Sequence, residues 1–170
     1  MAREANELSV LSPGGVTLAQ LRGMRDERLP VRLHEGALKE VEAAHRVVAR
    51  ILERGTVAYG INTGFGKFVH QTIPPDRLGE LQRNLVLSHS AGTGALLSDQ
   101  VVRLVMILKA IGLGRGCSGV RPEVVEALLA LVNTRAVERF GKAENSHVGP
   151  HIYSGHGSRG LCQPLVPGRT

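Results

Sequence analysis

The sequence predicts a mainly α-helical chain, and three observations indicate this fold class. Apolar residues recur every three to four positions between residues 38 and 52, which places them along one face of a helix. Glycine or proline stands at the ends of several apolar segments, where helices start and stop. Aromatic residues make up 3% of the 170-residue chain and tryptophan is absent, so we expect an aliphatic interior packed between helices.

The first two expected helices flank a glycine-rich segment. The first ends at Gly55, and its apolar stripe includes His45, which we expect to be packed rather than catalytic. Its aliphatic members are Leu38, Val41, Val48 and Leu52. Asp76 can cap the second helix, whose apolar stripe is leucine-rich and whose far end carries His89.

Two further helices are expected in the second half of the chain. Ser98 can cap a helix over about residues 100–113 that is apolar on nearly all sides, as is typical of a bundle interior. Pro122 can open another helix over residues 123–132, because a missing N–H has no cost at the first helical position. The apolar surface of this last helix requires a partner.

The segment between the first two helices reads Tyr59-Gly-Ile-Asn-Thr-Gly-Phe-Gly66. Its glycines allow positive φ and close backbone approach, as a mobile active-site loop requires. Glycine-rich surface turns share these features, so the segment alone leaves both interpretations open.

Two nucleotide-binding interpretations can be excluded by position. A phosphate-binding loop needs a glycine where the chain has Ile61 and a serine or threonine where it has Phe68. A dinucleotide-binding fingerprint over residues 112–117 would need its third glycine at Cys117, and the apolar run before it is too long for a strand. A helix that ends in a glycine-rich turn accounts for that segment better.

Two more motifs follow the tyrosine segment. One begins at Gln82 and contains Ser88-His89, and the other reads Ser118-Gly-Val-Arg-Pro-Glu. With residues 59–66 they resemble the amino-terminal part of the histidine ammonia-lyases, in the aromatic amino acid ammonia-lyase family. The resemblance runs from about Leu8 to Asn133, with the three motifs in the family's order and spacing.

This resemblance implies a reaction in which L-histidine loses ammonia to give trans-urocanate. The family uses an electrophile, methylidene-imidazolone, formed by cyclisation of an internal Ala-Ser-Gly, and its members are homotetramers. Tyr59 matches the family's catalytic tyrosine. A free phenol has a pKa near ~10, so a base role requires neighbouring positive charge or donated hydrogen bonds.

The resemblance also assigns substrate-binding residues. His89 matches the histidine that contacts the substrate imidazole, and Asn62 is grouped with it. The pair Ser88-His89 is typical of the histidine type, whereas relatives acting on tyrosine or phenylalanine carry His-Leu or Phe-Leu. The remaining residues of the active-site loop are Gly60, Thr63, Gly64, Phe65 and Gly66. On residue type alone, His89 could instead bond the last carbonyls of its helix.

Residues 134–170 depart from the family. The chain contains no Ala-Ser-Gly, and Pro150-His-Ile falls where the tripeptide would stand. The chain also stops several hundred residues before the family's full length. The tail carries half of the net charge of +6 and is rich in glycine and proline, so we expect it to be poorly ordered. We therefore divide the chain into a lyase-like region, residues 1–133, and a divergent tail, residues 134–170.

Composition disfavours several other functions. A pI near 10.0 permits nucleic-acid binding, but basic and acidic residues alternate in residues 1–133 and aromatic stacking residues are scarce. Gly149-Pro150 prevents one helix from presenting the tail histidines to a metal. No apolar segment indicates a signal or membrane span, and two cysteines give no disulfide framework. A cytoplasmic setting fits best.

Two function classes remain open. The chain is either an incomplete histidine ammonia-lyase that is inactive by itself, or a catalytically dead helical fragment that acts by association with other chains. A lyase for another aromatic amino acid is a further alternative within the first class.

Overall fold

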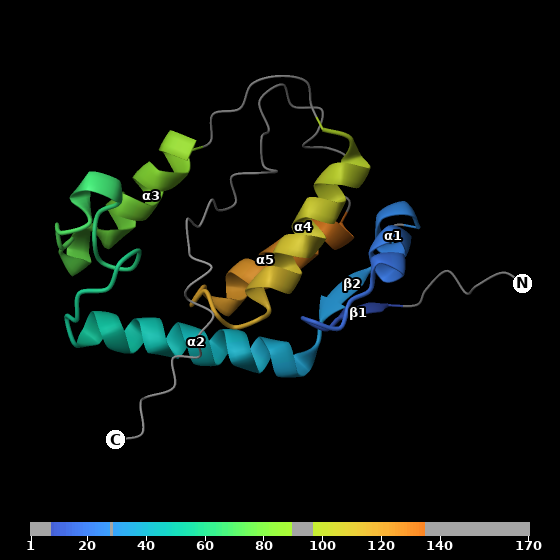
Figure 1. Cartoon of the computed structure of the whole chain (residues 1–170), viewed down its shortest axis with the longest axis horizontal. Helices are drawn as coiled ribbons and strands as arrows, with labels where there is room; N and C mark the ends of the chain where they lie inside the picture. Colours follow the sequence, from blue (N-terminus) through green and yellow to red (C-terminus); the bar gives the residue numbers. More distant parts are fainter. Residues whose placement is uncertain (1–7, 28, 90–96, 135–170) are drawn as a thin grey trace, which may run out of the picture.

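The computed structural model describes residues 8–27, 29–89 and 97–134, and for His89 it describes the backbone alone. In this part of the chain, helices dominate and two short strands are present (Figure 1). The helices are α1 (Leu18–Asp26), α2 (Glu35–Glu53), α3 (Leu78–His89), α4 (Asp99–Leu113) and α5 (Pro122–Asn133). The strands are β1 (Ser9–Leu11) and β2 (Val31–Leu33), and two 3-10 helices are η1 (Gly66–Phe68) and η2 (Pro75–Arg77). The mainly α-helical class is confirmed.

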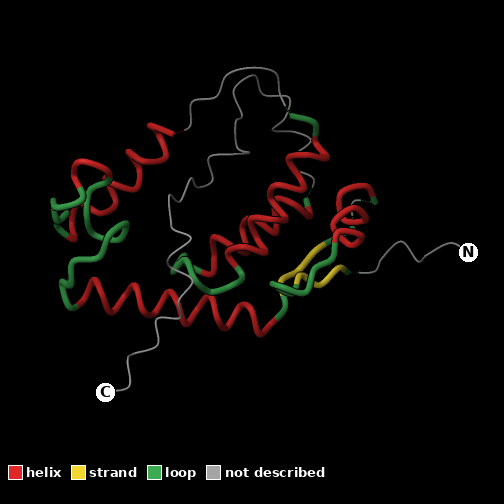
Figure 2. Tube along the Cα trace, viewed as in Figure 1, coloured by secondary structure: helices red, strands yellow, loops and turns green. Residues whose placement is uncertain are grey.

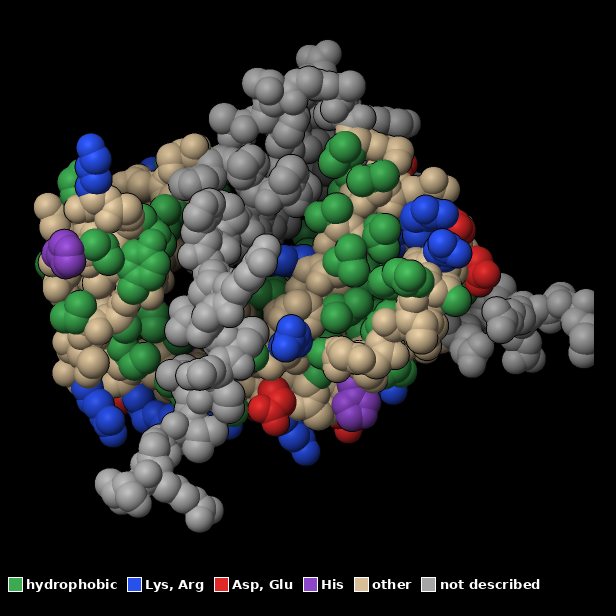
Figure 3. All heavy atoms as spheres, in the orientation of Figure 1, with side chains coloured by type: hydrophobic (Ala, Val, Ile, Leu, Met, Phe, Trp, Pro, Cys, Tyr) green, Lys and Arg blue, Asp and Glu red, His purple; other side chains and the backbone are tan. Residues whose placement is uncertain are grey.

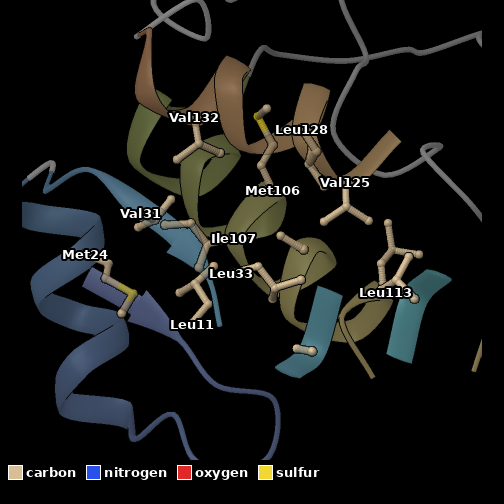
Figure 4. Close-up of a cluster of buried hydrophobic side chains, with 13 residues drawn as sticks. Leu11, Met24, Val31, Leu33, Met106, Ile107, Leu113, Val125, Leu128 and Val132 are labelled. Carbon is tan, nitrogen blue, oxygen red and sulfur yellow. The ribbon is translucent and has the colours of Figure 1, made fainter. Parts of the chain in front are cut away.

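The core lies where α4 and α5 pack against α1, α2 and the strand pair (Figure 4). Ile107 of α4, Val125 of α5 and Leu11 of β1 are completely buried. Burying one such side chain stabilises the fold by about 1.5–3 kcal/mol relative to leaving it exposed. The partner that α5 requires is therefore α4, which runs alongside it (Figure 2).

The strands form a parallel pair in which Leu11 lies beside Leu33, and α1 makes the connection between them. The side chain of Asn133, the last residue of α5, completes this pair. Its Oδ1 accepts a hydrogen bond from the Val31 N–H at 2.9 Å, and its Nδ2 donates to the Val31 carbonyl at 2.8 Å. The end of α5 is thus fixed to the backbone of β2.

Arg103 of α4 is a buried cation, 6% exposed, inside this apolar body. Its guanidinium donates to the carbonyls of Met24 at 2.8 Å and Val132 at 2.7 Å, and also to that of Leu29. These carbonyls belong to α1, α5 and the segment before β2. Because buried carbonyls need hydrogen-bond donors, Arg103 of α4 links the end of α1 and the segment before β2 to the distant end of α5.

The four expected helices are present, with two corrections at their starts. Asp76 does not cap α3, because Pro75 begins a 3-10 turn one residue earlier and Asp76 lies within it. Ser98 stands at the N-cap of α4, but its side chain makes no capping hydrogen bond. Pro122 occupies the first position of α5 as expected. His45 is packed, with Nδ1 3.2 Å from the Gly119 carbonyl.

Three elements of the amino-terminal region, β1, α1 and β2, were not expected from the sequence. The strands are three residues long, too short to show an alternating pattern. For α1 a signal existed, because Thr17 and Gln20 form a reciprocal capping box. Among the described residues, no helix is both long and apolar enough to cross a membrane.

Candidate active site

The expected active-site loop follows α2, which ends before Gly55 in the left-handed conformation with φ of +64°. The chain then folds back on itself. The Gly64 N–H donates to the Gln71 carbonyl at 3.0 Å, and Thr63 and Thr72 form an isolated antiparallel bridge. The loop is thus a small hydrogen-bonded unit that carries residues 59–66 between α2 and α3 (Figure 1).

Tyr59 lies near the start of this loop with half of its surface, 51%, exposed. Its ring contacts Phe65 edge-on, with 5.9 Å between centroids and 64° between planes. The described part of the chain provides no hydrogen bond to the phenol hydroxyl. About half of the Tyr59 surface is therefore open, while Phe65 restricts the ring on one side.

Asn62 is 5% exposed, and its side chain points into its own loop. Its Oδ1 accepts from the Ala58 N–H at 2.8 Å, and its Nδ2 donates to the Thr56 carbonyl at 2.9 Å. Its backbone carbonyl accepts from the Ile73 N–H at 2.8 Å. Asn62 therefore joins the segment before Tyr59 to the segment that returns toward α3.

The loop requires glycine at some positions because of backbone conformation and at another because of close packing. Gly60 has a φ of +77°, in the left-handed region that side chains disfavour. At Gly64 an added Cβ would lie 2.5 Å from the Phe68 Cβ and 2.6 Å from the Phe68 carbonyl oxygen. Gly66 also has a positive φ. Thr63 is buried in the same loop, and its hydroxyl donates a hydrogen bond to the Gly64 carbonyl at 3.0 Å.

His89 ends α3, so its backbone is placed while its imidazole lies outside what the structure describes. The start of α3 packs on η2, which connects it to the tyrosine loop. There Arg77 pairs with Glu80 at 3.0 Å, and the hydrogen bond from Arg77 lowers the pKa of the exposed Glu80 carboxyl. The structure thus brings the tyrosine loop and α3 into one region, without placing the Tyr59 hydroxyl relative to the His89 ring.

The third motif has a structural position that the sequence did not indicate. Gly119 has a φ of +66°, and a Cβ there would lie 2.3 Å from the Val48 Cγ2 of α2. Its carbonyl contacts His45, and Pro122 then starts α5. The Ser118-Gly-Val-Arg-Pro-Glu segment therefore contacts α2 through Gly119 and leads into α5, while Ser118, Arg121 and Glu123 are exposed.

The residues present do not fit the electrophile of the resembled family. No Ala-Ser-Gly occurs in the 170 residues, and the segment aligned with it lies outside the described residues. Over the described ranges, no group of three or more His, Cys, Asp or Glu side chains is arranged to hold a metal ion. The histidines of the tail also lie outside those ranges.

Comparison with known proteins agrees with the fold and the motifs. The sequence model of the aromatic amino acid lyase family matches residues 16–138. A histidine ammonia-lyase of Paracidovorax citrulli is 55% identical over 124 residues, which are 73% of this chain and 24% of that protein. One of Legionella pneumophila is 46% identical over 128 residues, 75% of this chain and 25% of that protein.

Solved structures show the same relationship. A tyrosine aminomutase from Streptomyces globisporus superposes with a TM-score of 0.70 at 28% identity, over 75% of this chain and 24% of that one. A histidine ammonia-lyase from Trypanosoma cruzi superposes with a TM-score of 0.68 at 32% identity, over 75% of this chain and 25% of that one. The chain spans about a quarter of the length of these relatives. By sequence and by fold, the chain belongs to the aromatic amino acid lyase family.

Proposed function

We propose that residues 1–133 are the amino-terminal part of a histidine ammonia-lyase, whose reaction converts L-histidine to trans-urocanate and ammonia. The observation that carries this proposal is the half-exposed Tyr59 on a hydrogen-bonded loop, in a region 55% identical to a named histidine ammonia-lyase. Residues 134–170 are a divergent segment in this proposal.

Tyr59 is the proposed base that removes the β-proton of the substrate. Its exposure makes the hydroxyl accessible, and the edge contact with Phe65 limits where the ring can point. A phenol becomes an effective base near neutral pH when positive charge or donated hydrogen bonds stabilise the phenolate. Because the described residues provide no hydrogen bond to this hydroxyl, we infer that such groups come from the remainder of the lyase.

His89 is the proposed contact for the substrate imidazole, with one ring nitrogen donating or accepting a hydrogen bond. The pair Ser88-His89 supports histidine over tyrosine or phenylalanine, on the resemblance alone. The position of His89 at the end of α3 supports a role at the edge of a site, since the chain leaves the helix there.

The 170-residue chain lacks the tripeptide from which the family's electrophile forms, so we expect no turnover by this chain alone. Tetrameric assembly belongs to this proposal on the resemblance, and a cytoplasmic setting belongs to it on composition.

The test is a fusion of residues 1–133 to the remainder of the Paracidovorax citrulli relative, assayed for urocanate by ultraviolet absorbance. We expect histidine turnover, and tyrosine and phenylalanine should be poor substrates. Tyr59→Phe keeps the ring but removes the base, so kcat should fall by about 10²–10⁴-fold. His89→Leu should mainly raise KM for histidine.

Normal kinetics for both variants would contradict the site assignment. Normal kinetics for His89→Leu alone would leave the lyase proposal standing and remove the support for histidine as the substrate. Gln100→Ala, at an exposed position of α4 outside the three motifs, is the control and should leave kcat and KM unchanged.

A further inference from the structure

We infer that Asn62 is a positioning residue, which holds Tyr59 in place through hydrogen bonds from its side-chain amide to the backbone of the same loop. The catalytic meaning of this inference rests on the proposed function. The structural part of the inference, that Asn62 holds Tyr59 in one orientation, does not depend on the proposed function.

The amide closes the turn that presents Tyr59. Asn62 and Ala58 are joined twice, because the Asn62 Oδ1 accepts from the Ala58 N–H at 2.8 Å and the Asn62 N–H donates to the Ala58 carbonyl at 3.2 Å. Tyr59 lies between these two residues. The backbone on its amino-terminal side is held again by the bond from Asn62 Nδ2 to the Thr56 carbonyl.

The same residue fixes the turn to the returning segment of the loop. The Asn62 carbonyl accepts from the Ile73 N–H at 2.8 Å, next to the bridge between Thr63 and Thr72. Asn62 is therefore the point at which the two sides of the loop meet. Among the described residues Tyr59 has no comparable support, since half of its surface is exposed and its ring contact is with Phe65.

A positioning role fits Asn62 better than direct substrate contact. Both polar atoms of the amide are engaged with loop backbone, and 5% exposure leaves little surface for a ligand. Removing the amide would leave the Ala58 N–H and the exposed Thr56 carbonyl to water, so the turn would lose the two side-chain bonds that close it.

The chain offers a direct readout, because it contains two tyrosines, Tyr59 and Tyr153. In a Tyr153→Phe background labelled with fluorotyrosine, a single ¹⁹F resonance reports on Tyr59. We expect a resonance distinct from that of an unstructured fluorotyrosine peptide. Asn62→Ala should move it to the peptide position. Asn62→Asp keeps the acceptor for Ala58 but loses the donor to Thr56, and should give an intermediate shift.

The matched control is Asn84→Ala, which removes an exposed amide from α3 and should leave the resonance unchanged. Circular dichroism should show unchanged helix content in all variants. A Tyr59 resonance that Asn62→Ala does not move would overturn the inference. Loss of helix content in both Asn62 variants would also overturn it, because Asn62 would then support the whole fold.

The fusion enzyme tests the link to catalysis. Asn62→Ala should lower kcat by about 10–100-fold with little change in KM, because small misplacement of a catalytic group has effects of this size. In a Tyr59→Phe background, Asn62→Ala should have no further effect. A raised KM that persists in that background would indicate direct substrate contact instead. An inactive parent fusion would count against the proposed function, and the ¹⁹F result would still decide the role of Asn62.

Discussion

The molecule has two regions that are held together by different forces. The helical body, residues 8–27, 29–55 and 97–134, contains the whole cluster of buried hydrophobic side chains. The tyrosine arm, residues 56–89, contributes none to it. The buried side chains of the arm are polar, Asn62 and Thr63, and hydrogen bonds to backbone define its loop.

This difference separates stability from proposed chemistry. The body gains its stability from apolar burial, which requires no particular orientation of single groups, together with the hydrogen bonds of Arg103 and Asn133. The arm presents Tyr59 through directional bonds, which fix an orientation and bury little apolar surface. The arm also exposes apolar side chains, and Figure 3 shows hydrophobic groups on its surface as well as over α4. A region of this kind is suited to a position against further protein.

The largest effect should come from the body. Arg103→Ala removes a guanidinium that donates to three carbonyls, and each buried carbonyl left unsatisfied costs about 1–3 kcal/mol. We expect the free energy of unfolding to fall by about 3–5 kcal/mol by these terms. Chemical denaturation followed by circular dichroism measures it. Arg83→Ala, at an exposed position of α3, is the control, and an equal small change in both variants would contradict the assigned role of Arg103.

A change confined to the arm should affect the arm alone. Gly64→Ala places a Cβ where Phe68 stands, so the loop must shift, with a cost of about 1–3 kcal/mol typical of overpacking. We expect faster amide exchange in residues 61–73 and unchanged exchange in α4 and α5. Equal loss of protection in both regions would show that body and arm form one cooperative unit.

A smaller effect is expected in association. Val86 and Leu87 of α3 are 65% and 58% exposed, and Phe68 and Val57 of the arm are also exposed; we call these four side chains the apolar surface of the arm. We expect the purified chain to self-associate through this surface. Replacing Val86 and Leu87 by glutamate should shift the light-scattering mass toward monomer. Leu18→Glu, on the exposed face of α1, is the control, and a chain that is monomeric without substitution would refute the expectation.

The helices of the body could be predicted from the sequence because periodicity is a local signal. The stripe of α2, the apolar α4 and Pro122 at the start of α5 each involve residues within a few turns. The strand pair and the contacts of Arg103 could not be predicted, since they join residues 22 to 79 positions apart. Their formation depends on tertiary packing, which no short pattern encodes.

The candidate site shows the same limit. Tyr59, His89 and the loop were identified through motifs, whereas the function of the Asn62 amide depends on where its atoms point. The sequence placed Asn62 with the substrate-binding residues by resemblance. Its bonds to Thr56 and Ala58 appear only once the loop has closed, and that closure is stabilised by the distant Gln71 and Ile73.

The central claim is that residues 1–133 carry an intact part of a histidine ammonia-lyase that requires the remainder of the enzyme. The most direct measurement compares urocanate formation by the purified 170-residue chain and by the fusion enzyme in one assay. We predict no turnover above a heat-killed control for the chain and clear turnover for the fusion. Turnover by the chain alone, or a folded fusion that is inactive, would contradict the account.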